Sequence, residues 1–386
     1  MELYVHIPFC VKKCRYCSFA SYAAKENEYA TYIDLLLKEA AARASEAEEP
    51  IHTVYIGGGT PSLLSPELFT RLAAGLKQCY GFSQVTEFSS EANPGTITPE
   101  WLGTAVSSGI NRLSIGMQAY QERHLKLLGR NHSYTEVCSS VHDARNAGID
   151  NISLDLIFGI PGQSILEWEE TLDAALALCP DHISAYGLIP EEGTPLFDDL
   201  STGLINLPDP EEEREMYSLA VSRLARHGLI QYEISNFAKP GRECAHNIGY
   251  WKQIPYIGLG LSAASMVRLS KEPEGISYIR RTNPSSFEEY SKMVLFSGHD
   301  IHTETISAGE ARFETMMLGL RMNEGISEAD FYSMHGITIE SCYGGKLSYL
   351  ESKGLLTHDN GRWKLTERGF DIQNSILVEL MDDRFS

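Results

Sequence analysis

The sequence has no uninterrupted run of about eighteen apolar residues, the length that a helix needs to cross a bilayer. Its first residues, Met1 to Pro8, also lack the basic segment and apolar core of a secretory signal. Basic residues are scarce, since 32 lysines and arginines stand against 52 acidic residues and leave a net charge of −20. Such a field repels nucleic-acid phosphates and anionic headgroups. We therefore expect a cytoplasmic protein that is not exported and binds no nucleic acid.

Cysteine is scarce as well, with eight residues in 386, far fewer than a disulfide scaffold contains. Three of the eight, Cys10, Cys14 and Cys17, are close together near the N-terminus. The others are scattered singly, and an isolated free cysteine usually behaves as a small buried apolar residue. We assign no chemistry to these five, which are Cys79, Cys138, Cys179, Cys244 and Cys342.

The first half of the chain alternates short apolar runs with helical stretches. Strands are expected at residues 3–7, 53–56, 85–90, 111–115, 152–157 and 182–188, and helices at 29–44, 66–79, 99–108, 134–147 and 166–178. Because functional-looking residues follow the strands, residues 1–195 predict an α/β fold, a partial (β/α)6 barrel with its site at the strand C-termini. A doubly wound sheet is the structural alternative.

The pattern changes after this unit. Residues 196–300 are expected to extend the first domain, with an acidic helix start at Glu211 and a short strand at 231–234. Residues 301–386 predict helices at 308–322, 327–333 and 339–353, followed by a hairpin around Asp359-Asn360-Gly361. This order predicts a helical, winged-helix-like domain, but its excess of acidic residues gives DNA recognition poor electrostatic support. We interpret it as a packing or lid module.

The strongest local signal is the loop that contains Cys10, Cys14 and Cys17, directly after the first strand. Cysteine runs of this kind hold iron–sulfur clusters. Three local ligands leave one iron of a [4Fe–4S] cube open to bind a substrate or cofactor. The alternative is a structural zinc site, which needs four ligands and would take His6 as the fourth.

This Cys-x-x-x-Cys-x-aromatic-Cys loop resembles that of radical S-adenosylmethionine (SAM) enzymes. The wider string Tyr4-Val5-His6-Ile7-Pro8-Phe9-Cys10 is similar to the family of oxygen-independent coproporphyrinogen III oxidases and the related HemW-type haem chaperones. The resemblance covers nearly the whole chain. It implies a [4Fe–4S] cluster on the three cysteines, a SAM molecule that chelates the unique iron, and a partial TIM-type barrel.

The resemblance also implies a set of SAM-binding residues. Glycines of the string Gly57-Gly58-Gly59-Thr60-Pro61 let the backbone approach a ligand, although without the cysteine loop they would be more typical of a tight strand-to-helix turn. A carboxylate within the apolar strand at 152–157 is costly to bury unless it is paired or bound. On physical grounds alone, Asp155 is therefore the strongest candidate of the set. Tyr4 and Tyr16 match positions near the cluster and SAM, or are wall packing. The full expected set is Tyr4, Tyr16, Gly58, Gly59, Thr60, Glu91, Gln118, Arg130 and Asp155.

A second string, Cys244 to Trp251, is expected in a loop and resembles the His-Asn-x-x-Tyr-Trp motif of the HemW-type chaperones. Imidazole is a common axial ligand of haem iron, and aromatic rings can stack on a porphyrin. The resemblance therefore makes His246 a candidate haem contact. Taken alone, a histidine beside aromatic residues is more often a structural side chain.

The two branches of the family differ in one readable position. The oxidases carry a further cysteine where this chain has Phe19, and a longer arm before the cluster loop. We therefore expect a protein that binds haem as cargo and delivers it to acceptor proteins, membrane-associated ones among them, with a reducing electron donor as another partner. Coproporphyrinogen III oxidation is the alternative, and no catalytic residue is assigned.

Overall fold

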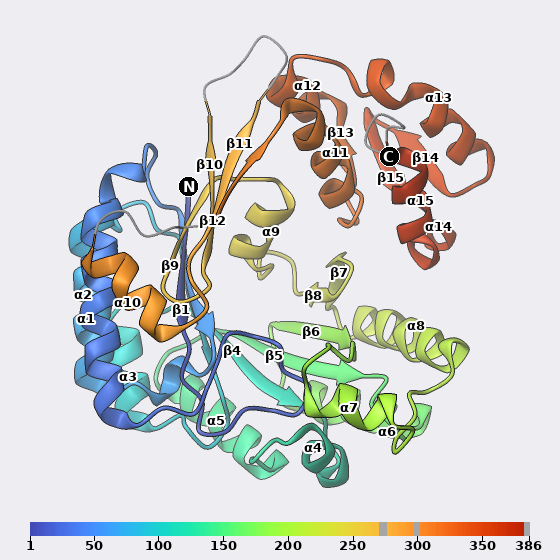
Figure 1. The fold of residues 1–386 in the computed structure, drawn as a ribbon. Coiled ribbons are helices and arrows are strands. Elements are labelled where there is room, and N and C mark those ends of the chain that lie inside the picture. The colour runs from blue at the N-terminus through green and yellow to red at the C-terminus, as the bar shows by residue number, and fades with distance from the viewer. Residues whose placement is uncertain (270–275, 297–301, 382–386) are drawn as a thin grey trace.

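The computed structural model describes residues 1–269, 276–296 and 302–381, which form one twelve-stranded sheet, its helices and a smaller C-terminal unit (Figure 1). The first six strands are parallel and neighbour one another in chain order. They are β1 (Glu2–Ile7), β2 (Thr53–Gly58), β3 (Glu87–Ala92), β4 (Arg112–Gln118), β5 (Asn151–Phe158) and β6 (His182–Gly187). This sequential order confirms the predicted partial barrel and excludes a doubly wound sheet, in which the strand order reverses near the centre.

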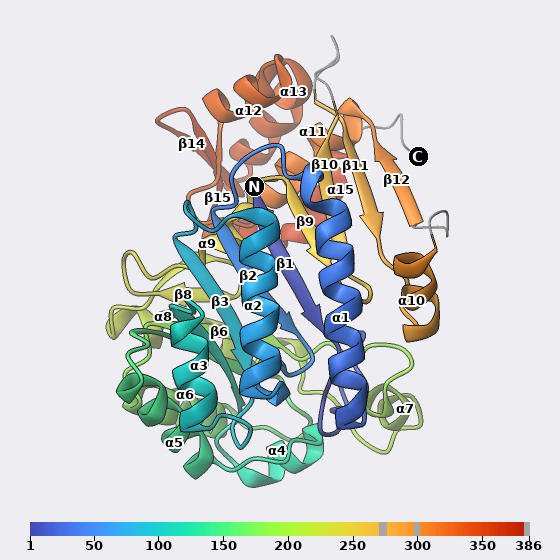
Figure 2. The same ribbon diagram turned by 90° about the vertical axis from the view of Figure 1, so that its left-hand side faces the viewer.

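Helices connect these strands, and α1, α2 and α3 cover one face of the sheet (Figures 1 and 2). Several begin at a hydroxyl cap; Ser133 and Ser164 accept backbone N–H groups, and Glu136 and Glu167 complete the capping boxes. The sequence analysis did not predict α4, because its 7 residues make only two turns, too few to show the helical repeat of apolar residues. The helical elements are α1 (Glu26–Arg43), η1 (Ala44–Glu46), η2 (Pro61–Leu63), α2 (Pro66–Tyr80), α3 (Pro99–Ser107), α4 (Glu122–Leu128), α5 (Tyr134–Asn146) and α6 (Ile165–Ala177).

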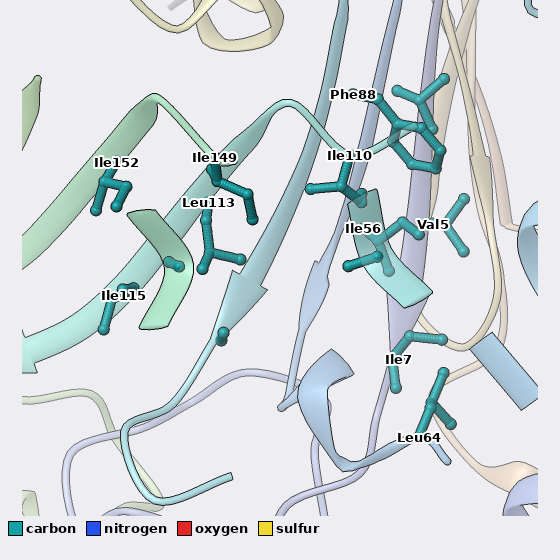
Figure 3. Close-up of a cluster of buried hydrophobic side chains, with 14 of the residues drawn as sticks. Val5, Ile7, Ile56, Leu64, Phe88, Ile110, Leu113, Ile115, Ile149 and Ile152 are labelled. Carbon is teal, nitrogen blue, oxygen red and sulfur yellow. The ribbon is translucent and has the colours of Figure 1, made fainter. Parts of the chain in front are cut away.

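The two faces of the parallel sheet differ in polarity because side chains alternate along a strand. Apolar residues such as Val5, Ile56 and Leu113 are buried in the core beneath the helices (Figure 3). The residues between them are polar: Ser114 and Asp155 occupy the opposite face. The helix-covered face therefore stabilises the fold, and the other face is left for a polar interior.

Residues 196–300, predicted as an extension, add strands to both edges of the first sheet. β8 pairs with β6 at one edge and β9 with β1 at the other. The predicted boundary at 300/301 lies outside the described residues, and the division into three domains stays a prediction. The elements are α7 (Pro195–Ser201), α8 (Pro210–Arg226), β7 (Ile230–Glu233), β8 (Asn236–Ala238), α9 (Ala245–Trp251), β9 (Tyr256–Leu259), β10 (Ala264–Arg268), β11 (Tyr278–Thr282) and α10 (Phe287–Leu295). β12 (His302–Ile306), from the segment predicted as the C-terminal domain, pairs with β11 and belongs to the same sheet.

The expectation of a loop at residues 244–251 is wrong, because α9 occupies this segment. The Glu87 carboxylate of β3 accepts hydrogen bonds from the Ala245 and His246 backbone N–H groups, at 2.8 and 3.2 Å. These groups have no partner within the helix, so the long-range carboxylate acts as its cap. α9 lies on the face of the sheet opposite α1 and α2, as both views show (Figures 1 and 2).

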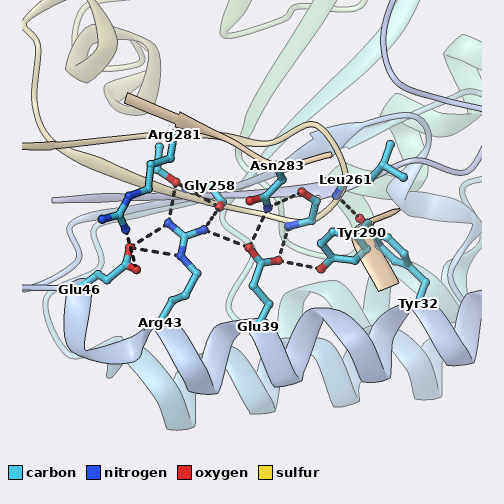
Figure 4. Close-up of polar contacts among 11 residues, drawn as sticks. Tyr32, Glu39, Arg43, Glu46, Gly258, Leu261, Arg281, Asn283 and Tyr290 are labelled. Atoms are coloured by element: carbon cyan, nitrogen blue, oxygen red, sulfur yellow. Dashed lines mark hydrogen bonds and ion pairs between the residues drawn. The ribbon is translucent and has the colours of Figure 1, made fainter. Parts of the chain in front are cut away.

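A buried ionic network attaches the added strands to α1 (Figure 4). The Glu39 carboxylate accepts hydrogen bonds from the Gly260 backbone, the Asn283 amide and the Tyr290 hydroxyl, at 2.9, 2.8 and 2.7 Å. Arg43, one turn later, donates to Glu39 and also to the Gly258 carbonyl oxygen. Each oxygen of this buried carboxylate is therefore satisfied, as burial of a charge requires.

The C-terminal unit packs around its own core, which includes Phe331, Leu347 and Trp363. The predicted hairpin is confirmed, since β14 pairs antiparallel with β15. Within the described residues, no helix is long and apolar enough to span a membrane. The elements of this unit are α11 (Ala308–Gly319), β13 (Ile326–Ser327), α12 (Glu328–His335), α13 (Ile339–Ser352), β14 (Leu356–Asp359), β15 (Arg362–Leu365), α14 (Glu367–Asp371) and α15 (Gln373–Leu380).

Candidate functional site

A cavity of about 560 Å³ lies over the polar face of the parallel sheet, against the loop that contains the three cysteines. The structure brings most of the predicted site residues together around it, although they come from six separate segments of the chain. Two predicted residues, Tyr4 and His246, do not line the cavity. Those that do are Cys10, Cys14, Tyr16, Cys17, Gly58, Gly59, Thr60, Glu91, Gln118, Arg130 and Asp155.

The cysteine loop is held in place by hydrogen bonds to distant segments. The Cys10 backbone N–H donates to the Tyr22 carbonyl oxygen at 3.0 Å. Two side chains approach the sulfurs: the Thr60 hydroxyl lies 3.7 Å from Cys10 Sγ, and Arg130 Nη1 lies 3.5 Å from Cys14 Sγ. Donors aimed at sulfur favour the thiolate, which is the form that ligates iron.

The zinc alternative does not fit this geometry. Both ring nitrogens of His6 are already used, Nε2 by the Ala20 carbonyl oxygen at 2.8 Å and Nδ1 by the Tyr4 hydroxyl at 2.9 Å. Within residues 1–269, 276–296 and 302–381, no three histidine, cysteine or acidic side chains converge as ligands of one ion. Thiolates on a [4Fe–4S] cube need no such convergence, because each binds a different iron. The loop therefore fits an iron–sulfur cluster.

The glycines after β2 are required by close packing. Gly58 has a φ of +107°, and a Cβ there would lie 2.4 Å from the His6 ring. A Cβ on Gly59 would lie 2.6 Å from the Phe9 carbonyl oxygen. The glycines thus let the end of β2 pack against the segment that leads into Cys10. This packing requires glycine in addition to the ligand approach that was expected from the sequence.

Charged side chains of both signs face the cavity. Glu91, at the end of β3, accepts hydrogen bonds from the Tyr55 hydroxyl at 3.0 Å and the Gly58 backbone N–H at 2.9 Å. Asp155 of β5 accepts from the Ser114 hydroxyl at 3.0 Å. The Arg130 guanidinium donates to the Asn93 amide oxygen and to the Gly116 carbonyl oxygen. Such a mixture of acids and a base suits a ligand that carries both charges.

Burial shifts the acids toward their neutral forms. Desolvation, followed by the nearby charge of Asp155, raises the pKa of Glu91 to about 7. Desolvation also raises the pKa of Asp155, although the Ser184 and Ser114 hydroxyls and two arginines oppose it. Two close carboxyl groups with raised pKa values are typical of a site that a ligand or proton completes.

Tyr4 and His246 lie outside the cavity wall, in an aromatic stack. The His246 ring is only 1% exposed and stacks on Tyr55 at 5.3 Å, and Tyr55 stacks on Tyr4 at 6.4 Å. His246 Nδ1 lies 2.8 Å from the Thr53 hydroxyl and Nε2 lies 2.9 Å from the Tyr250 hydroxyl. Haem ligation by His246 therefore requires its ring to give up at least one of these hydrogen bonds and its buried position.

Several lining residues were missed from the sequence, among them Asn93, Arg112 and Asn247. Arg112 begins β4 and lies in register with Ser114, Gly116 and Gln118 on one face. That alternation places Arg112 on the same face of β4 as the predicted site residue Gln118. Its position in the sequence could therefore have identified it as a residue of the site. Asn247 carried a signal as the second residue of the His-Asn-x-x-Tyr-Trp motif, but only its neighbour His246 was assigned a contact from the sequence.

Comparison with known proteins agrees with this geometry. Residues 4–175 match the radical SAM superfamily, and residues 306–372 match the HemN C-terminal domain. Haem chaperone HemW of Bacillus subtilis is 34% identical over 97% of this chain and 97% of its own length. HemW of Escherichia coli is 34% identical over 98% of this chain and 97% of its own. The chain belongs to the HemW family.

Other relatives of this HemW family member are consistent with the assignment. Mitochondrial radical S-adenosyl methionine domain-containing protein 1 of Bos taurus is 32% identical and covers 98% of this chain and 87% of its own. Coproporphyrinogen III oxidase (HemN) from Escherichia coli superposes with a TM-score of 0.83 at 22% identity, over 98% of this chain and 89% of the oxidase. That likeness shows a shared fold. Radical SAM membership implies a [4Fe–4S] cluster and SAM, which the cavity residues fit.

Proposed function

We propose that this HemW-family protein binds haem as cargo and delivers it to acceptor proteins, with a [4Fe–4S] cluster and SAM held in the cavity. Support comes from relatives named haem chaperone over the full chain length and from the mouth of the cavity. The mouth carries three exposed apolar side chains, Val11, Phe19 and Ile189, and Phe19 is 65% exposed. Such a surface matches the apolar face of a porphyrin.

Phe19 is the observation that carries the choice between the two branches. It stands where the oxidases have a cysteine, so the mouth offers a flat apolar ring instead of a thiol. Lys12 also lines the cavity and is exposed, so its ammonium group can pair with a haem propionate. An apolar rim with a cation suits an amphipathic cargo that must bind and leave.

The cavity residues have separate roles in this proposal. Cys10, Cys14 and Cys17 hold the cluster, and Arg130 stabilises the thiolate of Cys14 by its hydrogen bond. Glu91 and Asp155 bind the polar and cationic groups of SAM. When bound, a reduced cluster supplies the electron for reductive cleavage of SAM.

Partners follow from the same proposal. Haem acceptors, membrane-associated ones among them, take the cargo, and an electron donor reduces the cluster. The His246 contact with haem predicted from the sequence belongs to an open state, in which α9 has left Thr53 and Tyr55. Oxygen-independent coproporphyrinogen III oxidation remains the second candidate, favoured by the shared fold.

A haem titration of the anaerobically reconstituted protein tests the proposal. We expect wild type to bind haem, and Phe19→Asp to weaken binding about tenfold because a charge enters the apolar contact. Ile230→Asp is the matched control, since Ile230 is an exposed apolar residue that does not line the cavity. His246→Ala distinguishes an open-state ligand by a changed haem spectrum.

A turnover assay with coproporphyrinogen III separates the two candidates. Robust SAM-dependent conversion by the wild type would replace the chaperone proposal with the oxidase one. Absence of both haem binding and turnover would overturn both.

A further inference from the structure

One buried cation in the cavity has no hydrogen-bond partner among the described residues. Arg112, the first residue of β4, is 2% exposed and lines the cavity. Its Nε atom is buried without a hydrogen bond, and no described residue forms a hydrogen bond or ion pair with its guanidinium. A buried guanidinium without acceptors is costly, because arginine carries five N–H donors and keeps its charge.

The acids nearest to Arg112 are already bonded elsewhere. Glu87 accepts from the backbone of α9, Glu91 from Tyr55 and Gly58, and Asp155 from Ser114. These carboxyl groups lower the electrostatic cost of the cation at longer range. They leave its N–H donors available to whatever occupies the cavity.

A second unpartnered donor comes from α9. Asn247 lines the same cavity, and its side-chain amide makes no hydrogen bond to any residue that the structure describes. Its position is fixed, because the neighbouring His246 is held by Thr53 and Tyr250 and the helix start by Glu87. Asn247 is also the one member of the His-Asn-x-x-Tyr-Trp motif among the cavity-lining residues.

We propose that Arg112 and Asn247 form a carboxylate-binding subsite in the cavity, away from the cluster loop. The planar guanidinium offers two parallel N–H donors that match a carboxylate, and the Asn247 amide adds another. Arg112 lies four residues before Gly116, about 13 Å along β4. The Gly116 carbonyl oxygen accepts a hydrogen bond from Arg130, whose guanidinium also contacts Cys14 in the cluster loop. The subsite therefore takes a carboxylate that is remote from the thiolates.

One ligand of the proposed function supplies this group away from the iron: haem, through a propionate. The inference thus rests on the proposed function for its ligand. Haem dimethyl ester is the matched compound without free carboxylates, and it is compared with haem.

Asn247→Asp is the main test, because it keeps the shape of the side chain and replaces the amide donor by an anionic oxygen. We expect it to weaken haem binding about tenfold or more, and to leave the affinity for haem dimethyl ester within about twofold of wild type. Dissociation constants are measured by haem absorbance. Asn360→Asp, in the exposed β14–β15 turn, is the control for added charge.

Arg112→Lys is a second variant, which keeps the buried charge but loses the two parallel N–H donors of the guanidinium. We expect the same selective loss of affinity for the carboxylate-bearing compound. Iron content shows that each variant still holds its cluster. Unchanged affinities in Asn247→Asp, or an equal loss for haem and its dimethyl ester, would overturn the subsite and leave the proposed function in place. If wild type bound no haem, the proposed function would fail, and the subsite with it.

Discussion

Two buried polar clusters, one around Glu39 and one around Arg112, differ in whether the protein itself satisfies their hydrogen-bonding groups. Glu39 is 3% exposed and Arg112 is 2% exposed. The Glu39 carboxylate receives hydrogen bonds from four groups, and they attach α1 to the added strands (Figure 4). No described residue accepts a hydrogen bond from the Arg112 guanidinium. Burial is therefore equal, but only one cluster is complete.

The difference follows from what each cluster faces. Glu39 is enclosed by protein on all sides, so any missing partner costs stability directly. Arg112 borders the cavity, where a ligand can supply the missing acceptors. Mutations should accordingly divide the molecule: changes at Glu39 should alter unfolding, and changes around the cavity should alter ligand binding.

The cluster loop is the part of the cavity where the largest effect is expected. Cys14→Ala should abolish iron binding, from about four irons per chain to almost none, since each thiolate holds one corner of the cluster. Iron and sulfide analysis after anaerobic reconstitution measures this. Cys138→Ala, a partly buried cysteine outside the loop, should keep its iron. Tightly bound zinc in place of iron would contradict the assignment.

Glu39 gives the opposite behaviour. Glu39→Gln should lower the free energy of unfolding by about 3–5 kcal/mol, because Arg43 loses the charge beside it and Tyr290 loses an anionic acceptor. Denaturant unfolding measures the loss, with the exposed Glu211→Gln as control. SAM and haem affinities of the folded variant should match wild type. A stable variant with weakened ligand binding would break the distinction between the two clusters.

The same distinction explains what the sequence could predict. The strands could be predicted because apolar residues alternate along them, and Val5, Leu113 and Leu154 are examples from three strands. Burial of one face of the sheet under helices requires this alternation. The cysteines were visible because the loop alone brings them together. Arg112 and Asn247 were not, because their meaning depends on partners that are absent from their own segments. α9 was missed for the same reason, since its cap is Glu87, more than 150 residues earlier in the chain.

Asp155 offers a smaller effect on the cavity side. Asp155→Asn should weaken SAM binding about ten- to hundredfold, as expected when a hydrogen bond to a charged group worth about 1.5–3 kcal/mol is lost. Its iron content should stay at the wild-type level, because β5 contributes no cysteine. Equilibrium dialysis of SAM measures the change.

Ser184→Ala is a useful companion to this variant, since the Ser184 hydroxyl favours the ionised form of Asp155 and β6 contributes no cysteine ligand. It should produce a loss in the same direction but smaller. An unchanged SAM affinity in Asp155→Asn would return this residue to a structural role and remove it from the cavity side of the comparison.

The smallest expected effect is a pH dependence at Glu91. Its pKa is raised by desolvation from 4.5 to about 7, so between these values the folded protein binds more protons than the unfolded chain. Stability contributed by this group is therefore lost as pH rises from 4.5 through 7. Glu91→Gln cannot ionise and escapes that loss. Because Glu91 borders the cavity, we expect Glu91→Gln to gain about 1–2 kcal/mol on wild type between pH 5 and pH 7.5.

The comparison of the two proteins at each pH isolates this group from all the others that titrate in the same range. Denaturant unfolding at pH 5, 6, 7 and 7.5 provides the curve. A difference between Glu91→Gln and wild type that stays constant with pH would mean that Glu91 ionises normally in the folded protein, and that the cavity imposes no charge strain on its acids before a ligand binds.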